Sequence, residues 1–199
     1  MESQRDKVME ILSQNVIISS KELSSEGIHR ETIRRLLETG EIMRIARGLY
    51  TSSPFIPDEN FSFIVAQKIA PKSVICLLSA LSFHEIGIQN PSLVWIAIER
   101  GTRTPWVEDY PIQISLFSGE SYSSGIEAYT VDGVVIRVYC IAKTIADCFK
   151  YRNKIGLDVA IEALKDVMQN KRTSIEEILH FAKICRVEKV IKPYMESLV

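Results

Sequence analysis

Five arginines gather in one short segment of the sequence. Residues 28–50 hold these five against only three glutamates, whereas the whole chain carries 24 Lys and Arg against 25 Asp and Glu. A guanidinium group can bind a guanine edge bidentately, enter the minor groove or hold a phosphate. We therefore expect double-stranded DNA to be bound by six side chains of this segment: Arg30, Thr32, Arg34, Arg35, Arg44 and Arg47.

The same charges could also be solvated groups on an ordinary surface helix. The apolar residues Ile33, Leu36 and Leu37 are expected to face inward. A helical wheel then puts Glu31 and Arg35 opposite the core, with Thr32 and Arg34 on the flanks. Glu31 favours the alternative, because it would repel phosphate unless it accepts from a cytosine amino group. The arginines favour DNA contact.

The elements that must position these side chains follow from the apolar spacing. It predicts helices over residues 2–15, from about 22 to 27 and over 29–39, where Gly40 ends the last one. Residues 42–46 and 49–52 are predicted strands, joined by a turn at Arg47 and Gly48. This order is typical of a winged helix-turn-helix domain, although a purely structural three-helix cap would show the same periodicity.

No group of residues suggests a catalytic centre. His29, His84 and His180 are too far apart to suggest a metal site, and no H-E-x-x-H, G-x-S-x-G or G-x-x-x-x-G-K motif is present. We expect His29 to cap the helix that follows it and His84 to pack against its own helix. Glu99 ends a strand without an acidic partner, and a lone Asp147 is better explained by capping or an interhelical hydrogen bond.

We therefore predict a protein that is not an enzyme, with no catalytic residue, metal or cofactor. A metal-dependent nucleic-acid enzyme that uses the C-terminal sheet stays open as an alternative. A transcription regulator whose second domain senses a small ligand is a third possibility.

Two prolines, Pro54 and Pro57, bracket a connector and predict a boundary between domains at residues 1–53 and 58–199. Beyond it, predicted strands (73–78, 93–99, 112–117, 126–131, 134–140) alternate with two helices (60–69, 79–86). From residue 142 onward the period is helical throughout. The predicted fold class is α+β: an N-terminal winged helix-turn-helix followed by a mixed-sheet α+β domain that ends in a helical cluster.

The composition predicts a cytoplasmic protein. The longest apolar run, at 93–98, is six residues, too short to cross a membrane, and the N-terminus lacks the apolar core of a signal peptide. The four cysteines are widely separated within apolar segments, so we expect buried, reduced thiols. A net charge of -1 means that any nucleic-acid contact must come from a local patch.

Several segments resemble the AbiEi family of antitoxins. They are the segment 44–50, which ends in arginine-glycine-leucine-tyrosine, the helix at 79–87, the stretches 142–152 and 155–164, and the ending 186–198. The resemblance implies an antitoxin of a toxin–antitoxin or phage abortive-infection system. Such a protein would bind its own operator through the winged helix and counter a nucleotidyltransferase toxin through its C-terminal domain.

The C-terminal helices carry basic residues that we expect on a charged outer face. Lys143, Lys150 and Arg152, accompanied by Lys154 and Lys165, would suit an acidic or nucleotide-bearing partner such as the toxin. The alternative is that these side chains only solvate their helices.

Overall fold

The computed structural model describes residues 3–57, 60–107 and 110–198, which form two compact units. The first unit comprises residues 1–71 together with 106–110 and 130–136, and the second comprises the remainder. Compact contacts within each unit do not show that the unit folds independently. The domain limits 1–53 and 58–199 therefore stay a prediction, and residue 58 itself lies outside the described residues.

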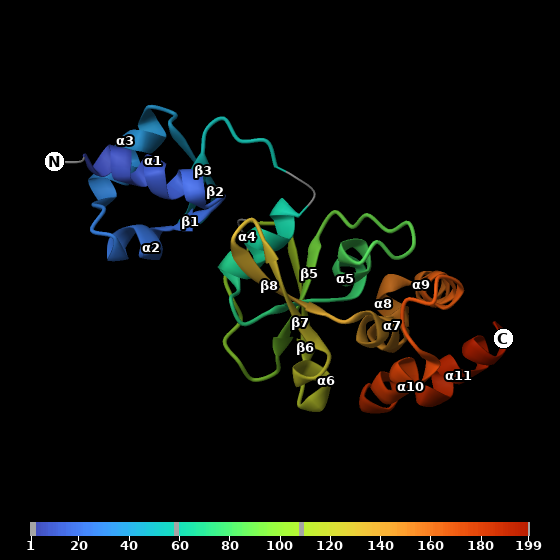
Figure 1. Cartoon of the computed structure of the whole chain (residues 1–199). Helices are drawn as coiled ribbons and strands as arrows, with labels where there is room; N and C mark the ends of the chain where they lie inside the picture. Colours follow the sequence, from blue (N-terminus) through green and yellow to red (C-terminus); the bar gives the residue numbers. More distant parts are fainter. Residues whose placement is uncertain (1–2, 58–59, 108–109, 199) are drawn as a thin grey trace. The chain divides into compact units, whose positions relative to one another are not determined.

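The first unit has the element order of a winged helix-turn-helix (Figure 1). Its three strands form a sheet of order β1-β3-β2, with both pairs antiparallel. The predicted strands match β2 and β3 residue for residue. The predicted start of the first helix at residue 2 lies outside the described residues. The elements are α1 (Gln4–Gln14), β1 (Ile18–Ser19), α2 (Ser20–Ser25), α3 (Arg30–Glu38), β2 (Ile42–Ala46), β3 (Leu49–Ser52) and α4 (Phe61–Ile69).

Local signals explain where the first helices begin. The Ser3 hydroxyl accepts from the backbone N–H of Asp6, and Ser19 forms a reciprocal capping box with Glu22 at the start of α2. A buried apolar cluster then joins the three helices to β1 and β2: Val8, Leu12, Ile18, Leu23, Ile28, Ile33, Leu36 and Ile42. This small core fixes which side of α3 faces outward.

The second unit contains most of a five-stranded mixed sheet of order β6-β5-β4-β8-β7. The β5–β6 and β4–β8 pairs are parallel, whereas β4–β5 is antiparallel. The predicted mixed α+β class, with helices gathered at the C-terminal end, is confirmed. The elements are β4 (Val74–Ile75), α5 (Leu77–Phe83), β5 (Val94–Glu99), β6 (Ile112–Phe117), α6 (Glu120–Ser123), β7 (Ile126–Val131), β8 (Val134–Tyr139), α7 (Ile141–Lys150), α8 (Arg152–Ile155), α9 (Leu157–Gln169), α10 (Ile175–Ile184) and α11 (Glu188–Glu196).

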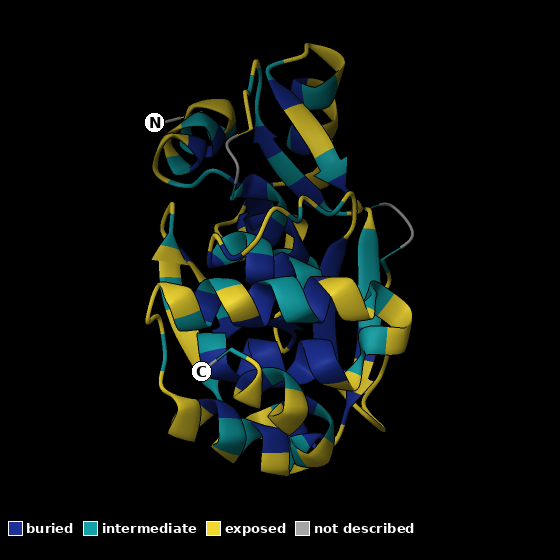
Figure 2. Ribbon diagram, turned by 90° about the vertical axis from the view of Figure 1, so that its right-hand side faces the viewer, coloured by how far each residue is buried: buried dark blue, intermediate teal, exposed yellow. Residues whose placement is uncertain are grey.

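Helix α7 lies at the centre of the helical cluster. It contacts α5, α9, α10 and α11, and its residues from Ala142 to Phe149 are all buried. In Figure 2 the inner helices are dark blue, whereas the outer ones alternate yellow and blue. Strand residues such as Trp95, Ala97 and Phe117 join the same core, so one face of the sheet is covered by these helices.

Several details differ from the sequence prediction. Helix α2 runs over Ser20–Ser25 and not from about 22 to 27, and further differences concern α5 and α6. The strand predicted at 73–78 ends after Ile75, and α5 begins two residues later, at Leu77, whose positive φ of 49° breaks the extended backbone. The short helix α6 was not predicted, because its four residues show no apolar period. Both elements depend on tertiary packing more than on local pattern.

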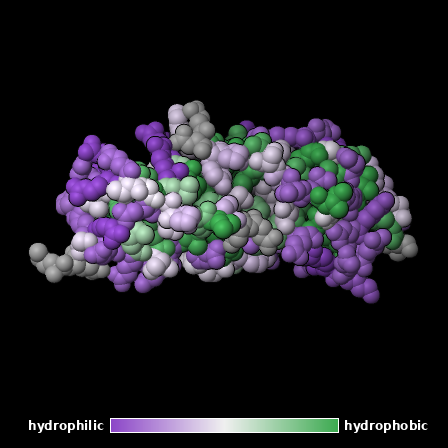
Figure 3. Space-filling model, turned by 90° about the horizontal axis from the view of Figure 1, so that it is seen from above, coloured by the Kyte–Doolittle hydropathy of each residue, from purple (hydrophilic) through white to green (hydrophobic). Residues whose placement is uncertain are grey.

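Exposed hydrophobic side chains are scattered. On the face in Figure 3, hydrophobic patches (green) are separated by hydrophilic side chains (purple). The two most exposed, Ile56 and Ile88, are 90% and 85% exposed and lie in loops. Such isolated residues are normal and do not define an apolar docking face. Within the described residues, no helix has the length and apolar character needed to span a membrane.

Candidate nucleic-acid interface

Helix α3 presents one polar side to solvent because its other side is anchored in the core. Ile33 and Leu36 are buried at 6% and 2% exposure, while Arg30, Arg34 and Arg35 are exposed. The strongly amphipathic character of α3 follows from this spacing. The orientation predicted from the helical wheel is thus the one observed for the arginines.

The exposed arginines differ in what they already bind. Arg34 pairs with Glu31 at 2.8 Å and with Glu38 at 3.6 Å along the same helix. By contrast, no hydrogen bond or ion pair links the side chains of Arg30 or Arg35 to another residue that the structure describes. Arg34 is thus shared between Glu31 and Glu38, and three arginines against two glutamates leave α3 with a net charge of +1.

Thr32 and Arg44 are partly used inside the unit. The Thr32 side chain is half-buried, and its hydroxyl donates to Gln4 Oε1 at 2.7 Å. The Arg44 side chain is exposed on β2, and its Nε donates to the carbonyl of Ala46 at 3.2 Å. The prediction that Thr32 faces DNA is thus weakened, because the tertiary fold turns its hydroxyl toward α1.

The turn of the wing is tied to the start of α2. Gly48 has a φ of 72°, and its carbonyl accepts from the backbone N–H of Ser20 at 2.7 Å. A Cβ at Gly48 would lie 2.9 Å from Ser20 Oγ. Glycine is therefore required both by backbone conformation and by close approach. Arg47, next to it, is exposed and makes no side-chain hydrogen bond or ion pair to any described residue.

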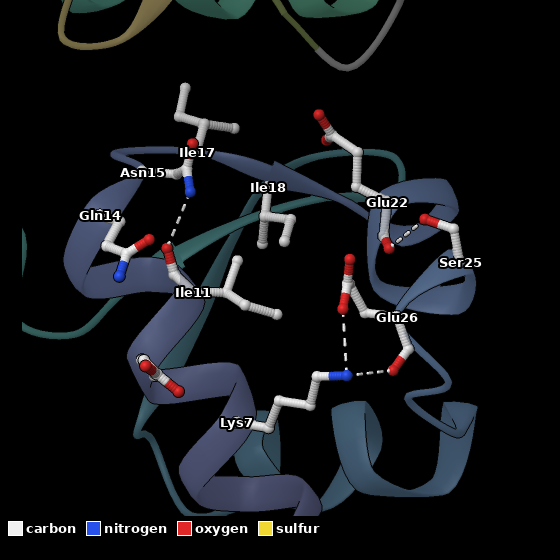
Figure 4. Close-up of a pocket in the computed structure, with 10 residues that line it drawn as sticks. Lys7, Ile11, Gln14, Asn15, Ile17, Ile18, Glu22, Ser25 and Glu26 are labelled. Atoms are coloured by element: carbon white, nitrogen blue, oxygen red, sulfur yellow. Dashed lines mark hydrogen bonds and ion pairs between the residues drawn. The ribbon is translucent and has the colours of Figure 1, made fainter.

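A cavity of about 430 Å³ lies between α1 and α2 (Figure 4). Ile11, Ile17 and Ile18 line it together with polar residues, and Lys7 reaches across to Glu26. The Lys7 ammonium donates to the Glu26 carbonyl at 2.8 Å and lies 3.0 Å from its carboxylate. None of the candidate DNA-binding arginines lines this cavity, so it is separate from the basic surface.

In the second unit, the expectation that Lys143 lies on a charged outer face is wrong. Its side chain and that of Asp147 are both 0% exposed, and their charged atoms lie 2.5 Å apart. The ammonium also lies 4.1 Å from the centre of the Tyr139 ring. Lys143 is buried because Asp147, one helical turn onward, compensates its charge, and a buried ammonium cannot contact a partner.

Asp147 forms the interhelical hydrogen bond expected for it. Besides binding Lys143, its carboxylate accepts a hydrogen bond from the thiol of Cys185 at 3.2 Å. Cys185 is the residue that directly follows α10. Burial raises the pKa of Asp147, whereas Lys143 and the thiol oppose that shift. Lys143, Asp147 and Cys185 thus link α7 to the end of α10 within the core.

The other two basic residues proposed for toxin contact are more accessible. Lys150 is exposed, although its ammonium donates to Ser121 Oγ at 3.0 Å. Arg152 is half-buried and donates to the carbonyl of Phe149 at 2.8 Å. Only these two of the three predicted side chains are available to a partner.

The thiols match the expected pattern with one exception. Cys76, Cys148 and Cys185 are buried and free, whereas Cys140 is half-buried. Burial raises the pKa of each, to about 12 for Cys185. They are therefore protonated near neutral pH and are poor nucleophiles.

The histidines lie apart. His29 is the N-cap residue of α3 but makes no side-chain capping hydrogen bond, and His180 is exposed on α10. His84 is buried, with Nε2 2.8 Å from the carbonyl of Tyr139, so that nitrogen carries the proton. Within the described ranges, no three His, Cys, Asp or Glu side chains gather closely enough to hold a metal ion.

His84 predicts a pH effect on stability. Burial lowers its pKa below the usual value of about 6.5, and the Tyr139 carbonyl only partly opposes this. Because the unfolded chain then binds the proton more readily than the folded one, stability should fall as pH drops below about 6.5. Calorimetry between about pH 7.5 and pH 5.5 should show a smaller decrease for His84→Gln than for the wild type. His180→Gln is the control, and equal decreases in all three proteins would contradict the prediction.

The fold is that of an α+β protein whose N-terminal unit has three helices and a small sheet in the element order of a winged helix-turn-helix. Residues 6–53 match the family described as "Transcriptional regulator, AbiEi antitoxin". The resemblance to AbiEi antitoxins is thereby confirmed for this N-terminal region.

A solved structure supports the fold of nearly the whole chain. It is the crystal structure of the RV2827C protein from Mycobacterium tuberculosis, with a TM-score of 0.66 and 12% identity. The match covers 92% of this chain and 72% of that one. At this identity the likeness concerns the fold alone. No curated protein matches the chain significantly.

Proposed function

We propose that this protein is an antitoxin that represses its own operon, with DNA bound by α3 and the wing. The observation that carries the proposal is the set of three exposed arginines, Arg30, Arg35 and Arg47, whose side chains bind no other described residue. Guanidinium groups on a recognition helix and wing suit base edges and phosphates. The family match over residues 6–53 supports the same assignment.

The three arginines have different proposed roles. Arg30 and Arg35 lie on α3, the element that enters the major groove in winged helix-turn-helix domains, so we assign base contacts to that helix. Arg47 lies at the turn of the wing and is assigned to the DNA backbone or the minor groove. Arg34 and Arg44 are assigned supporting roles because each already has partners within the unit.

The test of this proposal is direct binding of the purified protein to DNA. Duplexes that tile the segment upstream of its gene should include one that is bound more tightly than a scrambled duplex of equal length and composition. The affinity should fall with salt, because phosphate contacts release counterions. Equal affinity for every duplex would overturn the assignment of an operator-binding repressor.

The second part of the proposal is that the C-terminal part counters a nucleotidyltransferase toxin. The family match motivates it, and the accessible Lys150 and Arg152 give it a candidate surface on the second unit. Charge complementarity to an acidic or nucleotide-bearing toxin would speed association and orient the partner. Whether the toxin is bound directly or antagonised indirectly is part of the test.

Co-expression with the neighbouring toxin tests this second part. The wild-type chain should restore growth, and the Lys150→Glu/Arg152→Glu variant should restore it less while keeping its circular dichroism spectrum. Lys183→Glu/Lys189→Glu, at exposed positions of α10 and α11, is the charge-matched control. Full rescue by both double variants would remove Lys150 and Arg152 from the proposal.

The protein is proposed to act without an enzymatic activity of its own. The absence of nuclease activity would be checked by incubating pure protein with DNA and RNA in magnesium or manganese. Metal-dependent cleavage that one carboxylate substitution abolishes would favour the alternative of a nucleic-acid enzyme.

A further inference from the structure

One side chain of α1 holds the entrance of the recognition helix by three hydrogen bonds. Gln4 Nε2 donates to the carbonyl of Gly27 at 3.0 Å. Gln4 Oε1 accepts from the backbone N–H of His29 at 3.2 Å and from Thr32 Oγ1 at 2.7 Å. These partners are the turn between α2 and α3 and the first turn of α3 itself.

The chemistry of the partners fixes how the Gln4 amide is oriented. The Gly27 carbonyl can only accept, and the His29 N–H can only donate. A reversed amide would place two acceptors together at Gly27 and two donors together at His29. All three hydrogen bonds therefore form together in one amide orientation, with Nε2 toward the Gly27 carbonyl and Oε1 toward His29 and Thr32.

Backbone hydrogen bonds from Gly27 and Ile28 to α2 close the turn between α2 and α3, but the start of α3 has no side-chain cap of its own. Gly27 has a φ of 78°, and His29 makes no side-chain capping hydrogen bond at the start of α3. Lys7, one turn further along α1, holds the preceding residue Glu26 through its carbonyl and carboxylate (Figure 4). Side chains of α1 thus add the polar contacts that hold the turn and the first residues of α3 to α1.

We propose that Gln4 is a positioning residue for DNA recognition, which sets the pose of α3 relative to α1. This inference rests on the proposed function. Gln4 acts through α3, on which Arg30 and Arg35 lie, and its amide is already used by Gly27, His29 and Thr32. Ile33 and Leu36 anchor α3 in the core, so loss of Gln4 shifts the beginning of the helix without removing its apolar support.

The position of α3 affects two kinds of DNA binding differently. Base contacts need a side chain placed within a fraction of an ångström, whereas attraction to phosphates depends mainly on charge. Gln4 is uncharged, so its removal leaves every cation in place. Sequence discrimination should therefore fall while the salt dependence of binding stays the same.

The experiment compares the full-length wild type with Gln4→Ala on the operator duplex and on a scrambled duplex. The ratio of the two affinities should fall about tenfold in Gln4→Ala, as expected for the loss of hydrogen bonds of ordinary strength. The slope of log affinity against log salt should not change. Gln14→Ala, the same substitution at an exposed position of α1, is the matched control.

Thr32→Val gives a second, independent variant, because valine keeps the shape of threonine and removes only the hydroxyl. It should lower the affinity ratio by less than Gln4→Ala does. The double variant should lose no more than Gln4→Ala alone, because the Thr32 bond is made to Gln4. If Gln4→Ala does not fold, as judged by circular dichroism, Thr32→Val carries the test.

The possible failures are distinguishable. A wild type that does not discriminate between duplexes overturns the proposed function and this inference with it. A discriminating wild type and an unchanged ratio in folded Gln4→Ala overturn the inference alone. Equal loss of affinity for both duplexes, recovered on cooling, would make Gln4 a purely structural residue and also overturn it.

Discussion

Replacing Lys143 by alanine is expected to lower the free energy of unfolding of the second unit by about 3–5 kcal/mol. The substitution leaves the carboxylate of Asp147 fully buried, and among the described residues the Cys185 thiol is then its only remaining donor. It also removes an ammonium that lies 4.1 Å from the Tyr139 ring centre and 5.0 Å from that of Phe117. Since natural domains have only about 5–15 kcal/mol of stability, the loss is large.

The measurement should follow the second unit alone, because two units need not unfold together. The chain has two tryptophans, Trp95 in the second unit and Trp106 in the first. Trp106 is 57% exposed, so Trp106→Phe leaves Trp95 as the fluorescent probe at little cost. Urea unfolding in this background gives the free energy for each variant.

Two further variants separate a buried charge from a lost contact. Lys143→Met/Asp147→Leu removes both charges and should lie closer to the wild type than Lys143→Ala does. Lys150→Ala removes an exposed lysine of the same helix and should change stability by less than about 1 kcal/mol. A Lys143→Ala protein within about 1 kcal/mol of the wild type would contradict the role assigned to the pair.

The limits of α3, β2 and β3 could be predicted because their signals are local. The apolar period of Ile33 and Leu36 ends at Gly40, and the turn needs the positive φ that Gly48 adopts. An ion pair on this face of α3 could also be predicted, since Glu31 and Glu38 stand three residues before Arg34 and four after it. Arg35 has the same two glutamates four residues before it and three residues after it, so the spacing alone does not tell which arginine pairs with them.

The burial of Lys143 was harder to predict because lysine is rarely fully enclosed. Ala142, Ile145, Ala146 and Phe149 recur at three- and four-residue intervals, so they mark one apolar face of the helix and do not show that the opposite side is also buried. Asp147, four residues after Lys143, then has the spacing of a helical ion pair. This spacing is the only local sign of the pair, and it does not show that the pair is enclosed, so Lys143 was expected on the surface.

Gln4 could not have been found from the sequence. Its partners lie 23 to 28 residues away, and no local pattern links a glutamine at a helix start to a distant turn. The helical wheel gives the direction of Thr32 but not the residue of α1 that binds its hydroxyl. For that reason the sequence assigned the half-buried Thr32 to the DNA surface. Tertiary contacts of polar side chains are decided by geometry that composition and periodicity do not carry.

The joint replacement of Arg30, Arg35 and Arg47 by alanine is expected to abolish operator binding at the protein concentrations that saturate the wild type. Each base contact contributes about 1–3 kcal/mol, and each phosphate contact contributes less, so the three together correspond to an affinity loss of at least about a hundredfold. None of the three side chains stabilises the unit through a hydrogen bond or ion pair to a described residue. The triple variant should therefore keep the wild-type melting temperature.

The single variants assign the role of each arginine. Arg35→Ala should lower the affinity for the operator more than for a scrambled duplex, because a base contact carries sequence information. Arg47→Ala should lower both affinities alike and reduce the salt slope by about one, the signature of a phosphate contact. Arg103→Ala, which removes an exposed arginine of the second unit, is the matched control and should bind as the wild type does. If the triple variant and the wild type shift the operator duplex at the same concentration, α3 and the wing do not form the DNA-binding surface, and the arginines between residues 28 and 50 are solvated charges.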